Sequence, residues 1–414
     1  MVNIKNLILS AAALAGQSLA GERTAAGKYI VTLKLGITSS KFDGHMKWIN
    51  RIHAQANPGS VYSGVEYLYD GSYGFSGYSG SFDEPTLAEI RSSEDVEAVE
   101  QDQVWNLNWI QDESASERES PVAARWETTY TEQKNVTWGL ATLSHRYSGA
   151  REYSYDSDAG LATYAYVVDT GIRDTHDEFE GRAHKAYSIF DQETDFVGHG
   201  THVAGTIAGK TYGIAKKASI MAVKVFNGTA GLASDLLTGF NWAANDIIRN
   251  NRTEKAVINI SAGGPASTAF NLAVDRASAH GVTTVSAAGN SGVDASAFSP
   301  ASAQSSITVA AINSDWERAR YTNFGPAVKI FAPGTMVVSA SNKDDSSVVA
   351  MSGTSMASPH IAGLAIYIMS TQGITRVGPV TQHILSTATK DKVGGGTHGS
   401  PNLIGNNNVP GQWD

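Results

Sequence analysis

Five short, continuous apolar runs in the C-terminal two thirds of the chain constrain its fold most strongly. They cover residues 162–168, 220–226, 256–260, 282–287 and 307–312. Stretches with helical spacing alternate with them, at residues 202–208, 232–249 and 269–280. Strands that are apolar on both faces are typical of a parallel sheet covered by helices on each side. The sequence therefore predicts an α/β domain with a central parallel sheet flanked by helices, to which we assign residues 131–414.

A different pattern precedes this domain. Strand-like runs at residues 28–35, 62–69, 73–82 and 96–105 combine with helix-like runs at 42–56 and 85–90. The resulting β-α-β-β-α-β order is that of a small ferredoxin-like α+β domain, which we place at residues 21–110. Residues 111–130 are acidic and poor in apolar side chains. They are predicted to form an exposed linker that contains a maturation site.

The composition fits a large globular protein. Of 414 residues, 42% are hydrophobic and 17% are charged, which allows one large core and a smaller second one. The net charge of −9 comes mainly from residues 21–130, which carry 17 acidic and 9 basic residues. The domain that follows is nearly neutral and has no basic stripe, which argues against a nucleic-acid partner. The chain contains no cysteine, so disulfides and thiolate chemistry are excluded.

Residues 1–20 have the pattern of a secretory signal peptide. Lys5 precedes a short apolar run at residues 7–15, and small residues follow at Ser18 and Ala20. The apolar run is too short to span a bilayer, and no other segment is long enough. We therefore expect a secreted, extracellular monomer that has no membrane partner.

Ser355 is the first candidate for a reactive side chain. It lies in Gly353-Thr354-Ser355-Met356-Ala357-Ser358-Pro359-His360, between a strand-like run and a helix-like run. A serine in the first turn of a helix lies among unpaired backbone N–H groups, where negative charge is favoured. That environment suits a nucleophile, although it equally suits a serine that only caps a helix.

Two further side chains complete a possible catalytic set. Asp169 follows directly after the apolar run 162–168, at the edge where open α/β sheets place their sites. His199 stands between glycines at the start of a helix-like segment. A serine hydroxyl needs a base to take its proton, and a histidine base needs a carboxylate to orient it. Taken singly, Asp169 could be an ordinary turn residue and His199 a capping residue.

The same residues also suggest three other functions: an aspartic protease, a metal site and a peptide-binding module. An aspartic protease needs a second Asp-Thr/Ser-Gly besides Asp169-Thr170-Gly171, and the sequence has none. His199 and His202 could bind a metal, yet no third ligand with suitable spacing follows. A catalytically silent peptide-binding module on the same fold remains a further alternative, although every reactive position is filled.

Three motifs together resemble the signatures of subtilisin-like serine proteases. They are Tyr166-Val167-Val168-Asp169-Thr170-Gly171-Ile172, Gly198-His199-Gly200-Thr201-His202-Val203-Ala204-Gly205 and the octapeptide around Ser355. Shorter segments, such as Trp138-Gly139-Leu140, resemble the proteinase K branch found in secreted fungal alkaline proteases. The likeness covers residues 138–414, and residues 28–105 resemble the inhibitory, fold-assisting propeptide of these enzymes.

The resemblance implies an Asp169-His199-Ser355 triad in a secreted serine endopeptidase made as a self-inhibited, self-cleaving zymogen. It also assigns Asn290 to the oxyanion hole, together with the Ser355 backbone N–H. Strands beside an extended peptide substrate would come from Gly231, Ser261, Ala262, Gly263 and Gly264, and the last three with Gly289 would border the primary pocket. Because these segments hold no carboxylate, cleavage after apolar or aromatic residues is expected. The expected partners are protein or peptide substrates and the propeptide itself.

Glycosylation sequons occur at Asn135, Asn227, Asn251 and Asn259. Asn259 falls in an apolar strand and is expected to stay unmodified, while the other three are candidates for glycans.

The resemblance also implies calcium, and here the chain departs from the family pattern. One family site uses carbonyls that match Gln304 to Ser306 and a carboxylate at the position of Lys329; a second uses a carboxylate at the position of Ser386. An ammonium repels a divalent cation, so we expect no calcium at the first site, and no other cofactor. Asp174, Asp177 and Glu178 remain an alternative place for a calcium ion.

Overall fold

The computed structural model describes residues 25–56, 61–71, 73–107, 109–112, 123–125, 130–410 and 412. The signal-like segment 1–20 and most of the linker 111–130 lie outside these residues. Within them, no helix is both long and apolar enough to cross a membrane.

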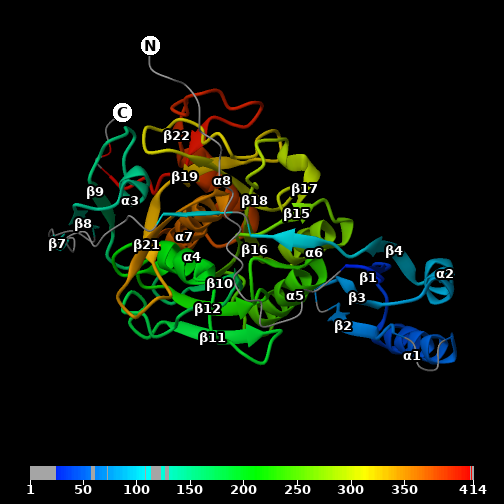
Figure 1. The fold of residues 1–414 in the computed structure, drawn as a ribbon. Helices are drawn as coiled ribbons and strands as arrows, with labels where there is room; N and C mark the ends of the chain where they lie inside the picture. The colour runs from blue at the N-terminus through cyan, green and yellow to red at the C-terminus, as the bar shows by residue number, and fades with distance from the viewer. Residues whose placement is uncertain are drawn as a thin grey trace, which may run out of the picture.

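A nine-stranded sheet forms the centre of the molecule (Figure 1). Its strands, in spatial order, are β11 (Ala183–Ser188), β12 (Ser219–Lys224), β10 (Tyr164–Asp169), β14 (Ala256–Ile260), β16 (Thr283–Ala287), β18 (Ile307–Ile312), β19 (Ile330–Pro333), β23 (Leu403–Ile404) and β22 (Thr389–Lys390). All neighbours pair in parallel except β22 and β23. The five apolar runs thus form the parallel sheet that the sequence predicts.

Helices cover both faces of this sheet because successive strand residues point to opposite sides. Val167 belongs to the core beneath α4 (His199–Ala208) and α7 (Thr354–Gln372). Its neighbour Val168 belongs to the core beneath α5 (Ala233–Arg249) and α6 (Thr268–Ala279). The remaining helices are α3 (Trp138–Thr142), α8 (Val377–Thr387) and the 3₁₀ turn Ala295–Ala297.

Short strands form small sheets outside the central nine-stranded sheet. They are β7 (Ala123–Arg125), β8 (Tyr130–Lys134), β9 (Glu152–Asp156), β13 (Ala230–Leu232), β15 (Gly264–Pro265), β17 (Phe298–Ser299), β20 (Val337–Ala340) and β21 (Val348–Ser352).

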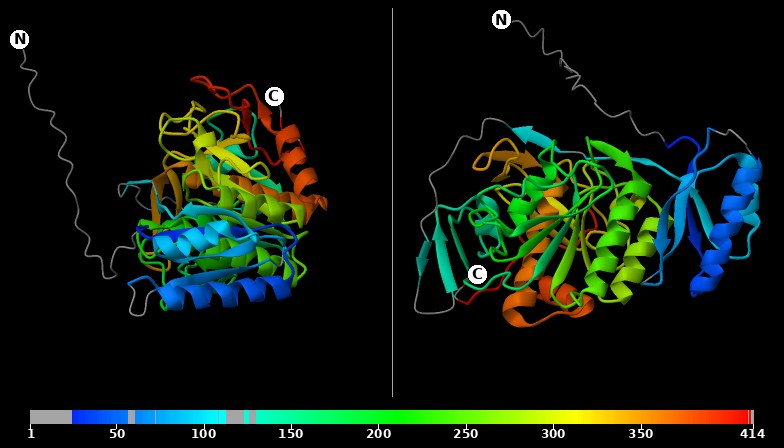
Figure 2. Two further views of the ribbon diagram at one scale, coloured as in Figure 1. Left: turned by 90° about the vertical axis from the view of Figure 1, so that its right-hand side faces the viewer. Right: turned by 90° about the horizontal axis from the view of Figure 1, so that it is seen from below.

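The N-terminal domain is a four-stranded antiparallel sheet of order β2-β3-β1-β4 with two helices (Figure 2). Its elements are β1 (Lys28–Leu33), α1 (Ser39–Ala56), β2 (Gly64–Asp70), β3 (Ser76–Ser81), α2 (Glu84–Ser92) and β4 (Val96–Gln101). They follow the predicted β-α-β-β-α-β order. One face of the sheet packs on α1 and α2, and the aromatic side chains Tyr69, Tyr73 and Phe75 of this domain share a core with α5 and α6.

Two expectations about residues 96–131 are wrong. The strand expected at 96–105 ends at Gln101, and β5 (Val104–Asn106) leaves the small domain to pair with β13. The break occurs where the Asp102 carboxylate accepts hydrogen bonds from the backbone N–H and hydroxyl of Ser234, at the start of α5. The linker is not wholly free either, because β6 (Ile110–Asp112) pairs with β21, and β7 pairs with β8.

Candidate active site

Asp169, His199 and Ser355 come together at the C-terminal edge of the parallel sheet. Asp169 is the last residue of β10, His199 is the first of α4, and Ser355 is the second of α7. Each side chain is buried, with residue exposures of 0%, 0% and 3%. The sequence places these residues far apart, and the packing of α4 and α7 beside β10 brings them to one point.

The Asp169 carboxylate holds the imidazole of His199. The Nδ1 atom of His199 lies 2.7 Å from Oδ1 and 3.0 Å from Oδ2 of Asp169. The Thr170 backbone N–H also donates to Oδ1, at 2.8 Å, and fixes the carboxylate. A hydrogen on Nδ1 satisfies this arrangement, and it leaves Nε2 with the lone pair that a general base requires.

The Ser355 hydroxyl is turned away from the histidine in this conformation. Its Oγ donates to the Ser261 carbonyl oxygen at 2.9 Å. Within the described residues, Nε2 of His199 is buried and has no hydrogen-bond partner. A rotation about one staggered side-chain torsion would bring the hydroxyl from the carbonyl toward the imidazole.

The loop after β16 presents Asn290 beside Thr354 and Ser355. Asn290 Oδ1 accepts hydrogen bonds from the backbone N–H of Thr354 at 2.8 Å and from its hydroxyl at 2.9 Å. Because Oδ1 of Asn290 faces Thr354, the NH₂ group of the same amide points away from Thr354. Gly289, with φ of 102°, turns the loop, and its N–H donates to the Thr354 hydroxyl. Thr354 is therefore a supporting residue that sequence reasoning missed.

Sequence reasoning also missed two buried charged residues near the Asp169–His199 pair, Asp195 and Lys224. Asp195 accepts hydrogen bonds from the N–H groups of Gly198 and Thr201 and so caps the helix that begins at His199. The Lys224 ammonium, 1% exposed, donates to the carbonyls of Thr170 and Phe226. Burial lowers the pKa of Lys224 to about 8, against the opposing pull of Asp195 and Asp169. The position of Asp195 four residues before His199 was the only sequence signal available for it.

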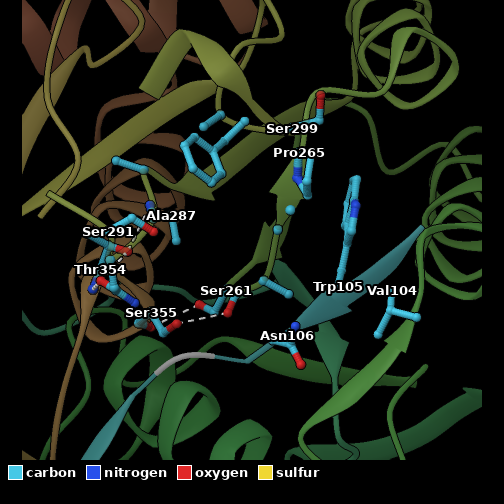
Figure 3. A pocket seen from close by; sticks show the side chains of 18 residues that line it. Val104, Trp105, Asn106, Ser261, Pro265, Ala287, Ser291, Ser299, Thr354 and Ser355 are labelled. Carbon is cyan, nitrogen blue, oxygen red and sulfur yellow. Dashed lines mark hydrogen bonds between the residues drawn. The ribbon is translucent and has the colours of Figure 1, made fainter. Parts of the chain in front are cut away.

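A segment of the N-terminal domain, which includes Val104, Trp105 and Asn106, lines the pocket that also holds Ser355 (Figure 3). In β5, Trp105 pairs with Gly231, and Asn106 forms an antiparallel bridge with Gly263 on the other side. The Leu107 N–H donates to the Thr229 carbonyl at 2.8 Å. Gly231 and Gly263, expected at the edges of a peptide site, thus do lie beside an extended peptide.

A cavity of about 150 Å³ opens between these edges. Its lining includes the expected pocket residues Ala262, Gly263, Gly264 and Gly289. It also includes Ser261, Ala287, Ala288, Asn290 and Ser355. None of the described residues that line it carries a charged side chain. The fully buried Trp105 fills one end, against Phe270, and a Cβ added at Gly264 would lie 2.0 Å from its ring. Only glycine at position 264 leaves room for this indole.

The same segment continues past His199. The Trp109 ring lies 4.7 Å from the His199 ring, measured between centroids. Beyond it, Ile110 of β6 pairs with Ser352, and Asp112 with Ala350. The described residues on both sides of position 108 therefore hold the chain across the triad in the manner of a bound substrate.

The comparisons with known proteins agree with this site. Residues 163–406 match the subtilase family of peptidases, and residues 28–108 match the peptidase inhibitor I9 family. The chain belongs to the subtilase family. It is 47% identical to alkaline protease 1 of Aspergillus flavus over 388 residues, which cover 92% of this chain and 91% of that protein. It is 42% identical to a cuticle-degrading serine protease of Arthrobotrys oligospora, covering 92% and 90% of the two chains.

Among solved structures, a cold-adapted subtilisin-like serine proteinase is similar, with a TM-score of 0.61 and 38% identity. The similarity covers 65% of this chain and 97% of that one. This subtilase is therefore a serine endopeptidase with an inhibitor-type propeptide. The subtilisin-like fold expected from the motifs is confirmed.

The second histidine of this subtilase's site motif has a structural role. His202 is buried, and its Nε2 lies 2.8 Å from the Val337 carbonyl oxygen, which joins α4 to β20. Burial lowers the pKa of His202 to about 3, so its ring is neutral. No group of three or more metal-binding side chains occurs among the described residues.

The residues at the family's calcium positions do not suit a divalent cation. Gln304, Ser305, Ser306 and Lys329 line a cavity of about 720 Å³ beside α8, and none of the described residues in its lining supplies a carboxylate. Ser386, expected at a separate site, lines the same cavity. The alternative acidic residues also serve other contacts: Asp174 pairs with Lys185, and the Glu178 carboxylate accepts the Thr211 and Tyr212 N–H groups.

The four sequons of this subtilase differ in exposure. Asn135 and Asn251 are exposed, and Asn227 is half-buried in the loop between β12 and β13. Asn259 is 1% exposed, and its side chain bonds to Ser261 and Ser358 beneath the nucleophile.

Proposed function

We propose that this subtilase is a secreted endopeptidase that cleaves peptide bonds with the Asp169-His199-Ser355 triad. The observation that carries the proposal is the buried Asp169–His199 hydrogen bond beside Ser355, at the point where the propeptide chain crosses the cleft. The segment 1–20, with its signal-peptide pattern, supports secretion. Asn135, Asn227 and Asn251 are proposed as glycan acceptors.

Each residue has a distinct role in the proposed reaction. Nε2 of His199 takes the Ser355 proton as Oγ attacks the substrate carbonyl carbon, and Asp169 stabilises the imidazolium that forms. The oxyanion accepts hydrogen bonds from the Asn290 amide and the Ser355 backbone N–H. When the tetrahedral intermediate collapses, the C–N bond breaks and His199 gives its proton to the leaving amine. Water, activated by the same histidine, then hydrolyses the acyl-enzyme.

The apolar lining of the cavity supports broad specificity for apolar or aromatic residues before the scissile bond. Among the described residues of the lining, none has a carboxylate that could pair with a basic substrate side chain. The buried Trp105 marks a second apolar subsite, at the end bounded by Gly264 and Phe270.

The propeptide contacts support self-inhibition. Its β4 places Glu100 at the start of α6, where the carboxylate accepts the Ser267 hydroxyl and the Thr268 N–H. Asp102 does the same at the start of α5. Negative groups are favoured at helix N-termini, so both carboxylates fix the propeptide on the enzyme and deliver β5 to the cleft.

The bond cleaved first in maturation is inferred from the register. Before the triad, Asn106 forms an antiparallel bridge with Gly263, and after it the Trp109 ring lies 4.7 Å from the His199 ring. The Ser261 carbonyl is the group that Ser355 Oγ contacts. We therefore assign self-cleavage to the stretch between Leu107 and Trp109, which precedes the linker 111–130 where the sequence analysis expected the maturation site.

Serine substitution tests the proposal. A Ser355→Ala precursor should accumulate uncleaved or be retained, whereas a Ser386→Ala control on the exposed face of α8 should mature normally. The expected loss of peptide hydrolysis is about a millionfold, a magnitude known for a subtilisin. Asn290→Ala should lower turnover by about 100- to 1,000-fold, also the subtilisin range, with KM little changed. Normal processing of Ser355→Ala in a host without other proteases would overturn the assignment.

A further inference from the structure

The backbone carbonyl of Ser355 lacks the donor that a helix normally supplies. In an α-helix, the carbonyl of one residue accepts the N–H of the fourth residue after it. Four residues after Ser355 stands Pro359, which lies inside α7 and has no N–H. Because a buried carbonyl without a partner is costly, another group has to replace that donor. The Ser261 hydroxyl does so, since its Oγ donates to the Ser355 carbonyl oxygen at 2.9 Å (Figure 3).

The side-chain amide of Asn259 fixes the direction of the Ser261 hydroxyl. A carbonyl can only accept a hydrogen bond, so the Ser261 proton is committed to Ser355, and the Ser261 Oγ accepts from its other neighbour. That neighbour is Nδ2 of Asn259, at 2.9 Å. At the opposite end of the amide, Oδ1 accepts the Ser358 hydroxyl at 2.7 Å. None of these four residues is more than 3% exposed, so water does not compete for the bonds.

This chain of hydrogen bonds holds Ser355 from the strand beneath it. Asn259 belongs to β14, whereas Ser355 and Ser358 belong to the first two turns of α7. Ser261 contacts Ser355 twice, because its hydroxyl donates to the Ser355 carbonyl and its own carbonyl accepts the Ser355 hydroxyl at 2.9 Å. If the Ser261 side chain turned to another rotamer, the start of α7 would lose one of its two ties to β14.

We propose that Asn259 is a positioning residue for the nucleophile: its amide keeps the Ser261 hydroxyl on the Ser355 carbonyl and thereby fixes the first turn of α7. This inference rests on the proposed function, which assigns the attack to Ser355. Asn259 does not line the cavity beside Ser355, so it acts through Ser261. The sequon at residues 259–261 is then a by-product of the network, since its asparagine and its serine are both members.

A double-mutant cycle on the mature enzyme tests the proposal. Asn259→Ala and Ser261→Ala should each lower kcat by about 10- to 100-fold, with KM changed less than about twofold, because a misplaced nucleophile slows the chemical step rather than substrate binding. If Asn259 acts through the Ser261 hydroxyl, the kcat of the double variant should lie within about twofold of that of Ser261→Ala alone. For a variant that matures slowly, the first-order rate of self-cleavage of its precursor gives the same comparison.

Asn407→Ala is the matched control for loss of a buried amide. Asn407 is also 1% exposed, and its amide bonds to the Ser154 carbonyl of β9 and to the Val409 N–H near the C-terminus. This substitution should lower the midpoint of thermal unfolding but leave kcat unchanged.

Ser358→Ala is the milder second probe, and it serves if Asn259→Ala does not fold. It removes the anchor of the amide but keeps the bond from Asn259 to Ser261, so kcat should fall by a smaller factor. Losses that multiply in the double variant would overturn the inference, as would a kcat for Asn259→Ala or Ser358→Ala no lower than that of the control. Both outcomes leave the protease assignment intact, whereas undiminished hydrolysis by Ser355→Ala would refute the proposed function itself.

Discussion

The propeptide and the catalytic domain share one chain but differ in how they are stabilised. The propeptide's own core holds eight buried apolar residues beneath α1 and α2. The catalytic domain contains two large cores on the two faces of its sheet. Moreover, Tyr69, Tyr73 and Phe75 of the propeptide complete one of the catalytic domain's cores rather than their own.

This difference indicates that the propeptide depends on its partner more than the partner depends on it. A domain of this size buries a smaller fraction of its surface on folding than a large domain does, and it is marginal alone. Once the chain between the domains is cut, loss of docking exposes the three aromatic side chains and weakens the fold that presents β5. Release and unfolding of the propeptide are thus coupled.

The largest effect, on folding of the precursor, is expected from the close approach of two strands in the four-stranded sheet of the propeptide. In β3, a Cβ added at Gly80 would lie 2.1 Å from the carbonyl oxygen of Gly64 on the neighbouring strand, a contact that no side-chain adjustment relieves. Gly80→Ala should therefore abolish the folded precursor, measured as yield and as the unfolding transition in a Ser355→Ala background. Gly44→Ala on α1 meets nothing within 4 Å and should instead stabilise the propeptide by about 0.5–1 kcal/mol. Equal yields of both variants would contradict this account.

A substitution at the contacts between the propeptide and the catalytic domain should have a smaller effect, on inhibition rather than on folding. Glu100→Gln removes the charge that caps α6 but preserves the shape of the side chain. Loss of one charge-assisted hydrogen bond should weaken inhibition by roughly 10- to 100-fold, seen as faster appearance of activity after self-cleavage. Glu89→Gln, on the exposed side of α2, is the matched control and should leave the delay unchanged. A delay that Glu100→Gln does not shorten would exclude the capping role.

The two regions also differ in what the sequence could predict. Apolar periodicity located the parallel strands, and the motifs located Asp169, His199, Ser355 and Asn290, because their spacing reflects local structure. The break at Asp102 could not be predicted, since it depends on the start of α5, more than 130 residues away. Nor could the roles of Lys224 and Thr354 be predicted, because each depends on contacts between distant segments.

The stability of the catalytic domain should depend on pH because two of its histidines are buried in their neutral form. Burial lowers the pKa of His202 to about 3 and of His360 to about 4, from 6.5. Below pH 6.5 the unfolded chain binds more protons than the folded one, so the stability of a Ser355→Ala precursor should fall as the pH drops from 6.5 toward 4.

A second rise in stability is expected on the alkaline side. Lys216 is buried over the rings of Tyr153 and Tyr155, and burial lowers its pKa from 10.5 to about 7. Between these values the unfolded chain again binds more protons, so stability should increase from pH 7 to 10. Burial also lowers the pKa of Lys224, to about 8, so Lys216→Met should reduce the alkaline rise without removing it, and should leave the part below pH 6.5 unchanged. An unaltered alkaline slope would show that Lys216 does not titrate as described.

Calcium is expected to have the smallest effect, measured as the midpoint of thermal unfolding. A divalent cation needs several oxygen ligands and at least partial compensation of its charge. The cavity that holds Gln304 to Ser306 presents the Lys329 ammonium and no carboxylate, so a cation there would be repelled. The unfolding midpoint of the Ser355→Ala precursor, which cannot digest itself, should therefore be the same in millimolar calcium and in excess chelator. Lys329→Asp sharpens the test, because it supplies an anionic ligand beside the same carbonyl segment and should introduce a calcium-dependent rise of the midpoint. A rise of several degrees in the unmodified chain would show that calcium binds elsewhere, and density for an ion beside Lys329 in a crystal would refute the specific claim.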